Sequence, residues 1–153
     1  MLSVFSGLPA DKHKDKNLIE KFSKSHGKKI LCGTSTIKTY CRILNLTPEI
    51  TINYTDLLPE AFYKIDGIAL ACEGLITLND CYKNLSGKPV KNKNALILSD
   101  ILKEEPEINF IIGTAKNPDS DFYKLKKLLP REEVINKIIN LLDRGKKISV
   151  LKV

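Results

Sequence analysis

The chain repeats one pattern: a short apolar run, a glycine-containing turn and then a helical segment. This repeated order limits the folds that the chain can adopt. The runs cover residues 2–7, 28–33, 67–74 and 108–115. Strand-sized apolar segments that alternate with helical segments are typical of α/β proteins. The pattern predicts one α/β domain over residues 1–153. We expect three layers, with about six strands in a mostly parallel, Rossmann-like sheet and about five flanking helices.

The segments between these runs supply the other elements. Apolar residues at helical spacing predict helices over residues 8–27, 34–46, 75–85, 95–105 and 131–145. Two further strands are predicted over residues 49–54 and 146–153. Residues 55–66 contain a proline and receive no assignment, and residues 116–130 are expected to form a long, turn-rich loop.

The basic character of the chain does not make it a nucleic-acid-binding protein. Its net charge is +7, but 22 of its 25 basic residues are lysines and they are spread along the whole chain. Base recognition relies on the paired donors of arginine, of which there are three, Arg42, Arg131 and Arg144. We therefore expect a solvated lysine surface and no nucleic-acid partner.

The sequence indicates neither a membrane-spanning protein nor a secreted one. No apolar run approaches the roughly 20 residues that a membrane-spanning helix needs. At the start of the sequence the apolar residues precede the lysines, the reverse of a secretory signal. We expect a cytoplasmic protein without a membrane partner.

The four cysteines, Cys32, Cys41, Cys72 and Cys81, form two pairs of the same spacing, and neither pair is a C-x-x-C motif. Structural zinc sites need two ligands close together on a turn, so we expect no metal site. Reduced, buried thiols in a reducing compartment are the expectation instead. The sequence also lacks both G-x-G-x-x-G and the phosphate-binding P-loop motif, so no cofactor is expected.

The turns that follow the strands are the candidate site. If those strands are parallel, their turns all emerge at the carboxyl edge of the sheet, where open α/β sheets bind ligands. In the first such turn, Gly33 allows close approach of the backbone, and the hydroxyls of Thr34, Ser35 and Thr36 precede a helix. This turn is either an anion site or an ordinary helix cap.

A second turn repeats this shape, with Glu73 and Gly74 at the corresponding place and Thr77 in the helix that follows. Glu73 ends an apolar strand, so it is either a group that binds hydroxyls or moves protons, or a partner for a lysine and a helix amide. Lys116 and Asn117 leave the next strand and are either part of the same cleft or a solvated loop.

We predict no catalytic residues. Ser35 lacks the G-x-S-x-G surroundings of a nucleophilic serine, and the cysteines have no histidine near them in sequence. The paired acidic residues of a two-metal phosphatase are missing as well, because Asp66 stands alone before a strand.

Four segments of the chain, in the same order, resemble the region that follows the phosphatase domain in bacterial serine/threonine phosphatases of the stage II sporulation protein E family. They are FSGLPADKHKDKNLIEKFSKSHGKKILCGTSTI, IDGIALACEGLITLND, INFIIGTAKNP and GKKISVLKV, which together span nearly the whole sequence. The chain departs from the family pattern at Thr34, where a second glycine is usual, and at Cys72, where threonine is usual.

The resemblance implies an accessory domain without the phosphatase acids, which lie in the preceding domain of those proteins. We expect a non-catalytic regulatory or ligand-binding domain for a small anionic or hydroxylated ligand, with a phosphatase domain or another protein as a partner. Thr34, Ser35 and Thr36 would donate to the anion, Glu73 and Thr77 would hold hydroxyl or amine groups, and Asn117 would close the pocket. Two alternatives stay open: a small enzyme acting on a phosphorylated sugar or metabolite, and a protein-interaction module.

Overall fold

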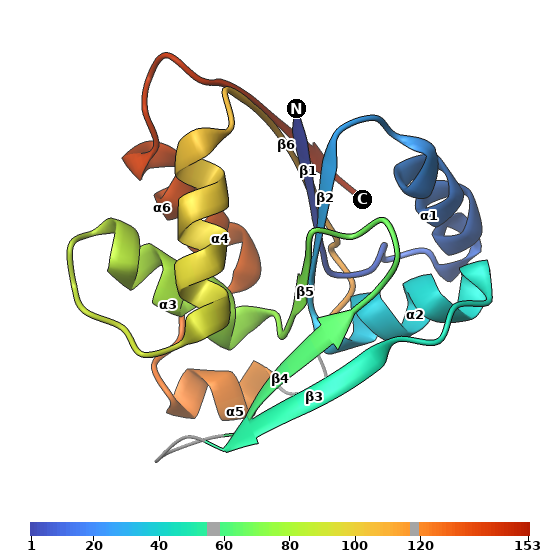
Figure 1. Cartoon of the computed structure of the whole chain (residues 1–153), viewed down its shortest axis with the longest axis horizontal. Helices are drawn as coiled ribbons and strands as arrows, with labels where there is room; N and C mark the ends of the chain where they lie inside the picture. Colours follow the sequence, from blue (N-terminus) through green and yellow to red (C-terminus); the bar gives the residue numbers. More distant parts are fainter. Residues whose placement is uncertain (55–58, 117–119) are drawn as a thin grey trace.

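The structure is a computed structural model, and it describes residues 1–54, 59–116 and 120–153. These residues form a three-layer α/β fold around a seven-stranded, mostly parallel sheet, as the sequence predicted. Figure 1 shows the sheet between two groups of helices. Among the described residues, no helix combines the length and the apolar character that crossing a bilayer requires.

Five strands run parallel, in the spatial order β5, β2, β1, β6, β7. Their bounds are β1 Leu2–Ser6, β2 Lys28–Cys32, β5 Leu70–Cys72, β6 Glu107–Ile112 and β7 Lys147–Lys152. When these five parallel strands are numbered in chain order, their spatial order is 3-2-1-4-5, as in a doubly wound sheet. The chain adds strands on one side of β1 as far as β5 and on the other side from β6 onward, so the strand order reverses between β1 and β6. β1 is central and all five of its residues are buried, because helices cover both of its faces.

An antiparallel hairpin extends the sheet beyond β5. It is formed by β3 (Glu49–Tyr54) and β4 (Pro59–Lys64), and β4 also pairs with β5 in antiparallel orientation. Figure 1 shows the hairpin projecting from the sheet. The described residues therefore contain seven strands where about six were expected, and β4 lies in a segment that the sequence left unassigned.

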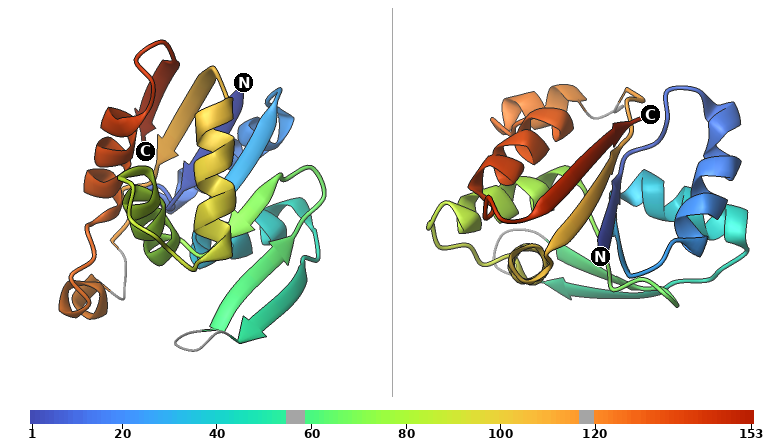
Figure 2. Two further views of the ribbon diagram at one scale, coloured as in Figure 1. Left: turned by 60° about the vertical axis from the view of Figure 1, so that its left-hand side comes forward. Right: turned by 90° about the horizontal axis from the view of Figure 1, so that it is seen from above.

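Helices α1 (Asp15–Lys24) and α2 (Thr34–Leu44) pack on one face of the sheet, and a 3-10 turn, η1 (Lys12–Lys14), precedes α1. Helices α3 (Leu75–Leu85), α4 (Lys93–Glu104) and α6 (Arg131–Leu141) pack on the other face. Figure 2 shows the two groups from two further directions. The larger part of the apolar core lies under α3, α4 and α6, where side chains such as Leu98 and Ile135 are fully buried.

Two expectations about loops and strand ends were wrong. Residues 116–130 were expected to be a loop, but they include a short helix, α5 (Ser120–Leu125). The strand expected over residues 67–74 is confined to Leu70–Cys72, because a turn that closes with a hydrogen bond from Ile68 N to Ile65 O takes up its first residues. All four cysteines are free and buried, as expected.

Candidate functional site

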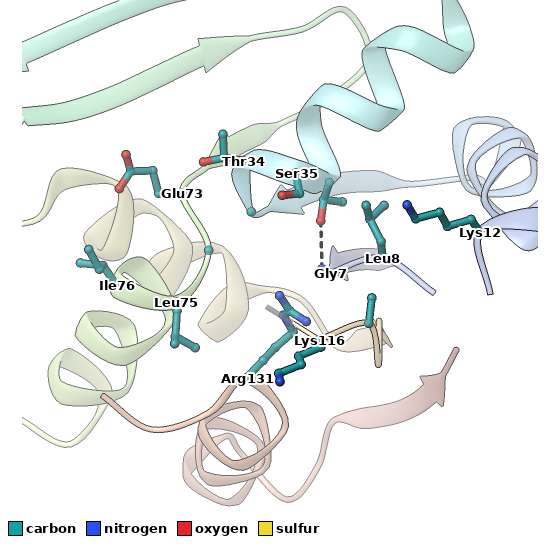
Figure 3. A pocket seen from close by; sticks show the side chains of 14 residues that line it. Gly7, Leu8, Lys12, Thr34, Ser35, Glu73, Leu75, Ile76, Lys116 and Arg131 are labelled. Atoms are coloured by element: carbon teal, nitrogen blue, oxygen red, sulfur yellow. Dashed lines mark hydrogen bonds between the residues drawn. The ribbon is translucent and has the colours of Figure 1, made fainter. Parts of the chain in front are cut away.

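The strand-to-helix turns gather at the carboxyl edge of the sheet and enclose a cavity of about 380 Å³. The turns after β1, β2, β5 and β6 all contribute to it, because these four strands are parallel. Figure 3 shows the cavity and its lining side chains. The lining residues are Gly7, Leu8, Lys12, Gly33, Thr34, Ser35, Thr36, Glu73, Gly74, Leu75, Ile76, Ala115, Lys116 and Arg131.

Two helices begin at this cavity without a side-chain cap from the described residues. Gly33 precedes α2 and Gly74 precedes α3, so neither cap position carries a side chain that could accept from the first-turn amides. Gly33 N donates to Cys72 O at 2.8 Å, which holds the two helix starts side by side. The first amides of a helix have no partner within it, so both starts present donors and a partial positive charge to the cavity.

Among the described residues, side-chain caps occur at the starts of η1 and α4, whereas α1 and α6 begin without one, at Lys14 and Pro130. The carboxylate of Asp11 accepts from His13 N at the start of η1, at 3.0 Å. Asn92 accepts from Ala95 N at the start of α4, at 3.1 Å. An uncapped start is therefore found elsewhere as well, and α2 and α3 are set apart because both begin at the cavity after a glycine, where a ligand can take the place of the cap.

The three hydroxyl residues of the first turn of α2 differ in their surroundings. Thr36 is buried, and its Oγ1 accepts a hydrogen bond from Gly7 N at 2.9 Å, which ties the turn after β1 to α2. Ser35 is exposed and Thr34 is half-buried. Figure 3 shows both of these residues at the cavity, so their hydroxyls are the ones best placed to donate to a ligand.

Three cationic side chains line the cavity. Lys12 comes from η1, Lys116 from the segment after β6 and Arg131 from the first residue of α6. Nη1 of Arg131 donates to Gly113 O at 3.1 Å. Figure 3 shows the amino group of Lys12 directed toward Leu8 and the guanidinium of Arg131 directed toward Gly7.

Among the described lining residues, the single carboxylate belongs to Glu73, in the turn between β5 and α3. Its side chain is half-buried. In Figure 3 it lies on the opposite side of the cavity from Lys12. We call the part of the cavity lined by Lys12, Lys116 and Arg131 its basic side and the part at Glu73 its acidic side. In Figure 3 Ile76 lies on the acidic side, and Leu75 lies between Ile76 and Arg131.

The structure brings together six of the eight residues that the sequence indicated, namely Gly33, Thr34, Ser35, Thr36, Glu73 and Gly74. Thr77 lies on α3, is only 2% exposed and is not part of the lining. Asn117 lies outside the described residues.

Sequence reasoning missed Lys12 and Arg131. Arg131 did carry a signal: it is the first residue of α6, directly after Pro130, where the helix dipole disfavours a positive charge. The same first turn holds Glu132 and Glu133, so the arginine breaks the local pattern. In the structure its guanidinium turns back to the sheet and donates to Gly113 O.

The start of α6 is fixed by Asn79 of α3. Asn79 Nδ2 donates to Leu129 O at 3.1 Å, and Leu129 N donates to Asn79 Oδ1 at 2.9 Å. The amide side chain is 5% exposed, so both bonds are shielded from water. Leu129 lies two residues before Arg131, so we expect this two-way clamp to help position the guanidinium at the cavity.

Two thiols lie directly beneath the cavity, at the ends of β2 and β5. Cys32 and Cys72 are register partners, and their Sγ atoms are 3.7 Å apart. The hydrogen bond to Cys72, together with burial, raises the pKa of Cys32 well above its usual value. Cys32 therefore remains a neutral thiol at physiological pH and is not poised as a nucleophile.

Metal binding finds no support in the described part of the chain, where no three His, Cys, Asp or Glu side chains cluster. No protein-family model matches the chain, and no curated protein or solved structure is significantly similar to it. What the chain binds therefore has to be inferred from the residues of the cavity.

Proposed function

We propose that this chain is a non-catalytic regulatory or ligand-binding domain that holds a small anionic or hydroxylated ligand at the carboxyl edge of its sheet. The observation that carries the proposal is the cavity itself, where two helix starts without side-chain caps meet three cationic side chains. Backbone amides at helix starts and nearby cations both favour an anion. The cavity volume falls in the range of small-molecule sites.

The wider setting that we propose is an accessory domain of a phosphatase of the stage II sporulation protein E family, in the cytoplasm. This part rests on the four sequence blocks that resemble that family. All four cysteines are buried in the apolar core, which suits reduced thiols.

Isothermal titration against a panel of phosphorylated metabolites, nucleotides and carboxylic acids tests ligand binding. We expect at least one small anion to bind, and the double variant Lys12→Met/Ser35→Ala to lose most of the affinity. Lys12 and Ser35 are both exposed, so the variant should keep its fold. Absence of binding across the panel, or unchanged affinity in the variant, would refute the proposed site.

A second candidate function is a small enzyme that acts on a phosphorylated sugar or metabolite. The position of Glu73 favours it, since this residue lines the cavity that would hold the anion and its carboxylate could serve as an acid or base. Turnover that disappears in Glu73→Gln would establish the enzyme, whereas binding without turnover would establish the regulatory domain.

A further inference from the structure

We propose that the ligand is a phosphomonoester of a small hydroxylated compound, with its dianionic phosphate at the basic side of the cavity and its hydroxyl groups toward Glu73. This inference rests on the proposed function and specifies it. It names both the charge of the ligand and its orientation.

The charge of the lining points to a dianion. Lys12, Lys116 and Arg131 supply three positive charges, and Glu73 supplies one negative charge. The lining therefore carries two more positive than negative charges, and the starts of α2 and α3 add their partial positive charge. A monocarboxylate neutralises only part of this excess. A phosphomonoester carries close to two negative charges at neutral pH.

The donors of the site match the acceptors of a phosphate group. Three terminal oxygens accept several hydrogen bonds each, and they suit a site that surrounds them with amides, hydroxyls and cations. Thr34 and Ser35 line the cavity in the first turn of α2, and Lys12 lines it beside Leu8. The guanidinium of Arg131 lies below them in Figure 3, so hydroxyls, amides and cations line the same cavity.

Glu73 fixes the orientation. A phosphate beside this carboxylate would be repelled, so the anionic end lies on the side of Lys12 and Arg131. The carboxylate can only accept hydrogen bonds when ionised, and hydroxyl groups of the ligand can donate to it. Ile76 lies on the same side as Glu73 and Leu75 lies between Ile76 and Arg131, so both side chains can pack against the carbon skeleton of the ligand.

Glycerol 3-phosphate is a suitable probe, because it is a small, chemically stable phosphomonoester with two hydroxyl groups. Its binding is measured by isothermal titration at pH 7.5 and pH 5.5, beside inorganic sulfate, inorganic phosphate and lactate. Between these pH values the phosphomonoester passes its second pKa of about 6, so the dianion fraction and the affinity fall roughly fourfold. Sulfate stays a dianion throughout, so its affinity stays constant unless groups of the protein titrate.

The outcomes separate this inference from the proposed function. Binding of lactate as tight as that of glycerol 3-phosphate, or an unchanged affinity for glycerol 3-phosphate at pH 5.5, overturns the requirement for a dianion and leaves a general anion site. Failure of all four anions, and of the wider panel above, overturns the proposed function itself. A phosphoserine peptide that binds more tightly than glycerol 3-phosphate overturns the small-molecule assignment.

Variants test the orientation. Lys12→Met and Arg131→Met should each weaken glycerol 3-phosphate binding about tenfold, as expected for a charge-assisted contact of about 1.4 kcal/mol or more. Lys88→Met, at an exposed lysine in the loop after α3, is the matched control and should leave affinity unchanged. Glu73→Gln should lower the ratio of glycerol 3-phosphate affinity to inorganic phosphate affinity, since only the former uses the carboxylate. An unchanged ratio places the hydroxyl groups elsewhere and overturns the orientation.

Discussion

The guanidinium of Arg131 packs against the backbone of Gly7 and occupies the space that a Cβ atom at Gly7 would need. Gly7 lies directly after β1 with a φ of +86°, and Arg131 Nη1 also bonds to Gly113 O, directly after β6. β1 and β6 are the strands between which the order of the parallel strands reverses. Doubly wound sheets usually hold their ligand at that crevice. Here an arginine fills it, and the cavity extends toward the ends of β2 and β5.

Replacement of Gly7 should therefore act through Arg131. Gly7→Ala adds a methyl group where the guanidinium lies, and we expect both a lower stability and weaker anion binding. Gly87 is the matched control, because its φ is +90° and a Cβ atom added there would meet nothing within 4 Å. Gly87→Ala should cost about 1–2 kcal/mol from backbone strain alone. Gly7→Ala should cost about 1–3 kcal/mol more from overpacking.

Urea denaturation gives both values, and isothermal titration gives the affinities. Equal costs for Gly7→Ala and Gly87→Ala, with unchanged anion affinity, would contradict the contact between Arg131 and Gly7. A variant at Gly87 that binds anions like the wild type confirms that general destabilisation is not the cause.

The clamp between Asn79 and Leu129 should control the site from a distance. Asn79→Ala removes both hydrogen bonds of the clamp and a third, from Asn79 Nδ2 to Leu75 O, and it leaves two backbone groups of Leu129 without this partner. We expect a loss of about 1–3 kcal/mol of unfolding free energy and weaker anion binding, because the start of α6 is no longer held. Asn136→Ala, at an exposed position of α6, is the control and should change stability by less than about 0.5 kcal/mol. If Asn79→Ala lowers stability but leaves anion affinity intact, the clamp does not position Arg131.

Buried thiols should make the protein less stable at alkaline pH. Burial raises the pKa of Cys81 to about 12, from a usual value near 9. Above pH 9 the unfolded chain loses this proton while the native chain keeps it, so stability falls as the pH rises from 9 toward 12. Each such thiol lowers the free energy of unfolding by at most about 1.4 kcal/mol per pH unit in this range.

Urea denaturation at pH 8 and pH 10 measures this effect, and Cys81→Ala should reduce the difference between the two values. A thiol reagent should also label the native protein slowly and the unfolded protein fast. Equal stability at pH 8 and pH 10, or rapid labelling of the native chain, would be incompatible with the burial of these thiols.

The parallel strands could be predicted from the sequence because both of their faces are apolar. The helices behind them could be predicted because each has one clear apolar stripe. β4 could not be predicted, since it begins at Pro59 and belongs to an antiparallel hairpin that lies outside the alternation of strands and helices. Proline is tolerated at the first residue of a strand, but in a sequence without a structure it indicates the end of a strand or helix. α5 was missed because it lies among turn-forming residues and spans only Ser120–Leu125.

The part of the candidate site that follows β2 and β5 could also be predicted, because parallel topology alone brings such turns to one edge. Arg131 could not be placed there by the same reasoning. It starts the helix that leads to β7, and its position depends on the clamp at Asn79 and on the close approach of Gly113 to the backbone of Gly7 and Leu8. Contacts of this kind join residues far apart in sequence and leave little trace in local composition.

Backbone amide shifts in a ¹H–¹⁵N NMR titration with inorganic phosphate test the central claim most directly. The account predicts that the largest changes fall on Gly33, Thr34, Ser35, Gly74 and Leu75, at the uncapped starts of α2 and α3. Amides at the opposite edge of the sheet, such as those of Lys28 and Lys147, should remain unaffected. Absence of any shift, or shifts spread over the exposed lysines of α1, would contradict an anion site at the carboxyl edge.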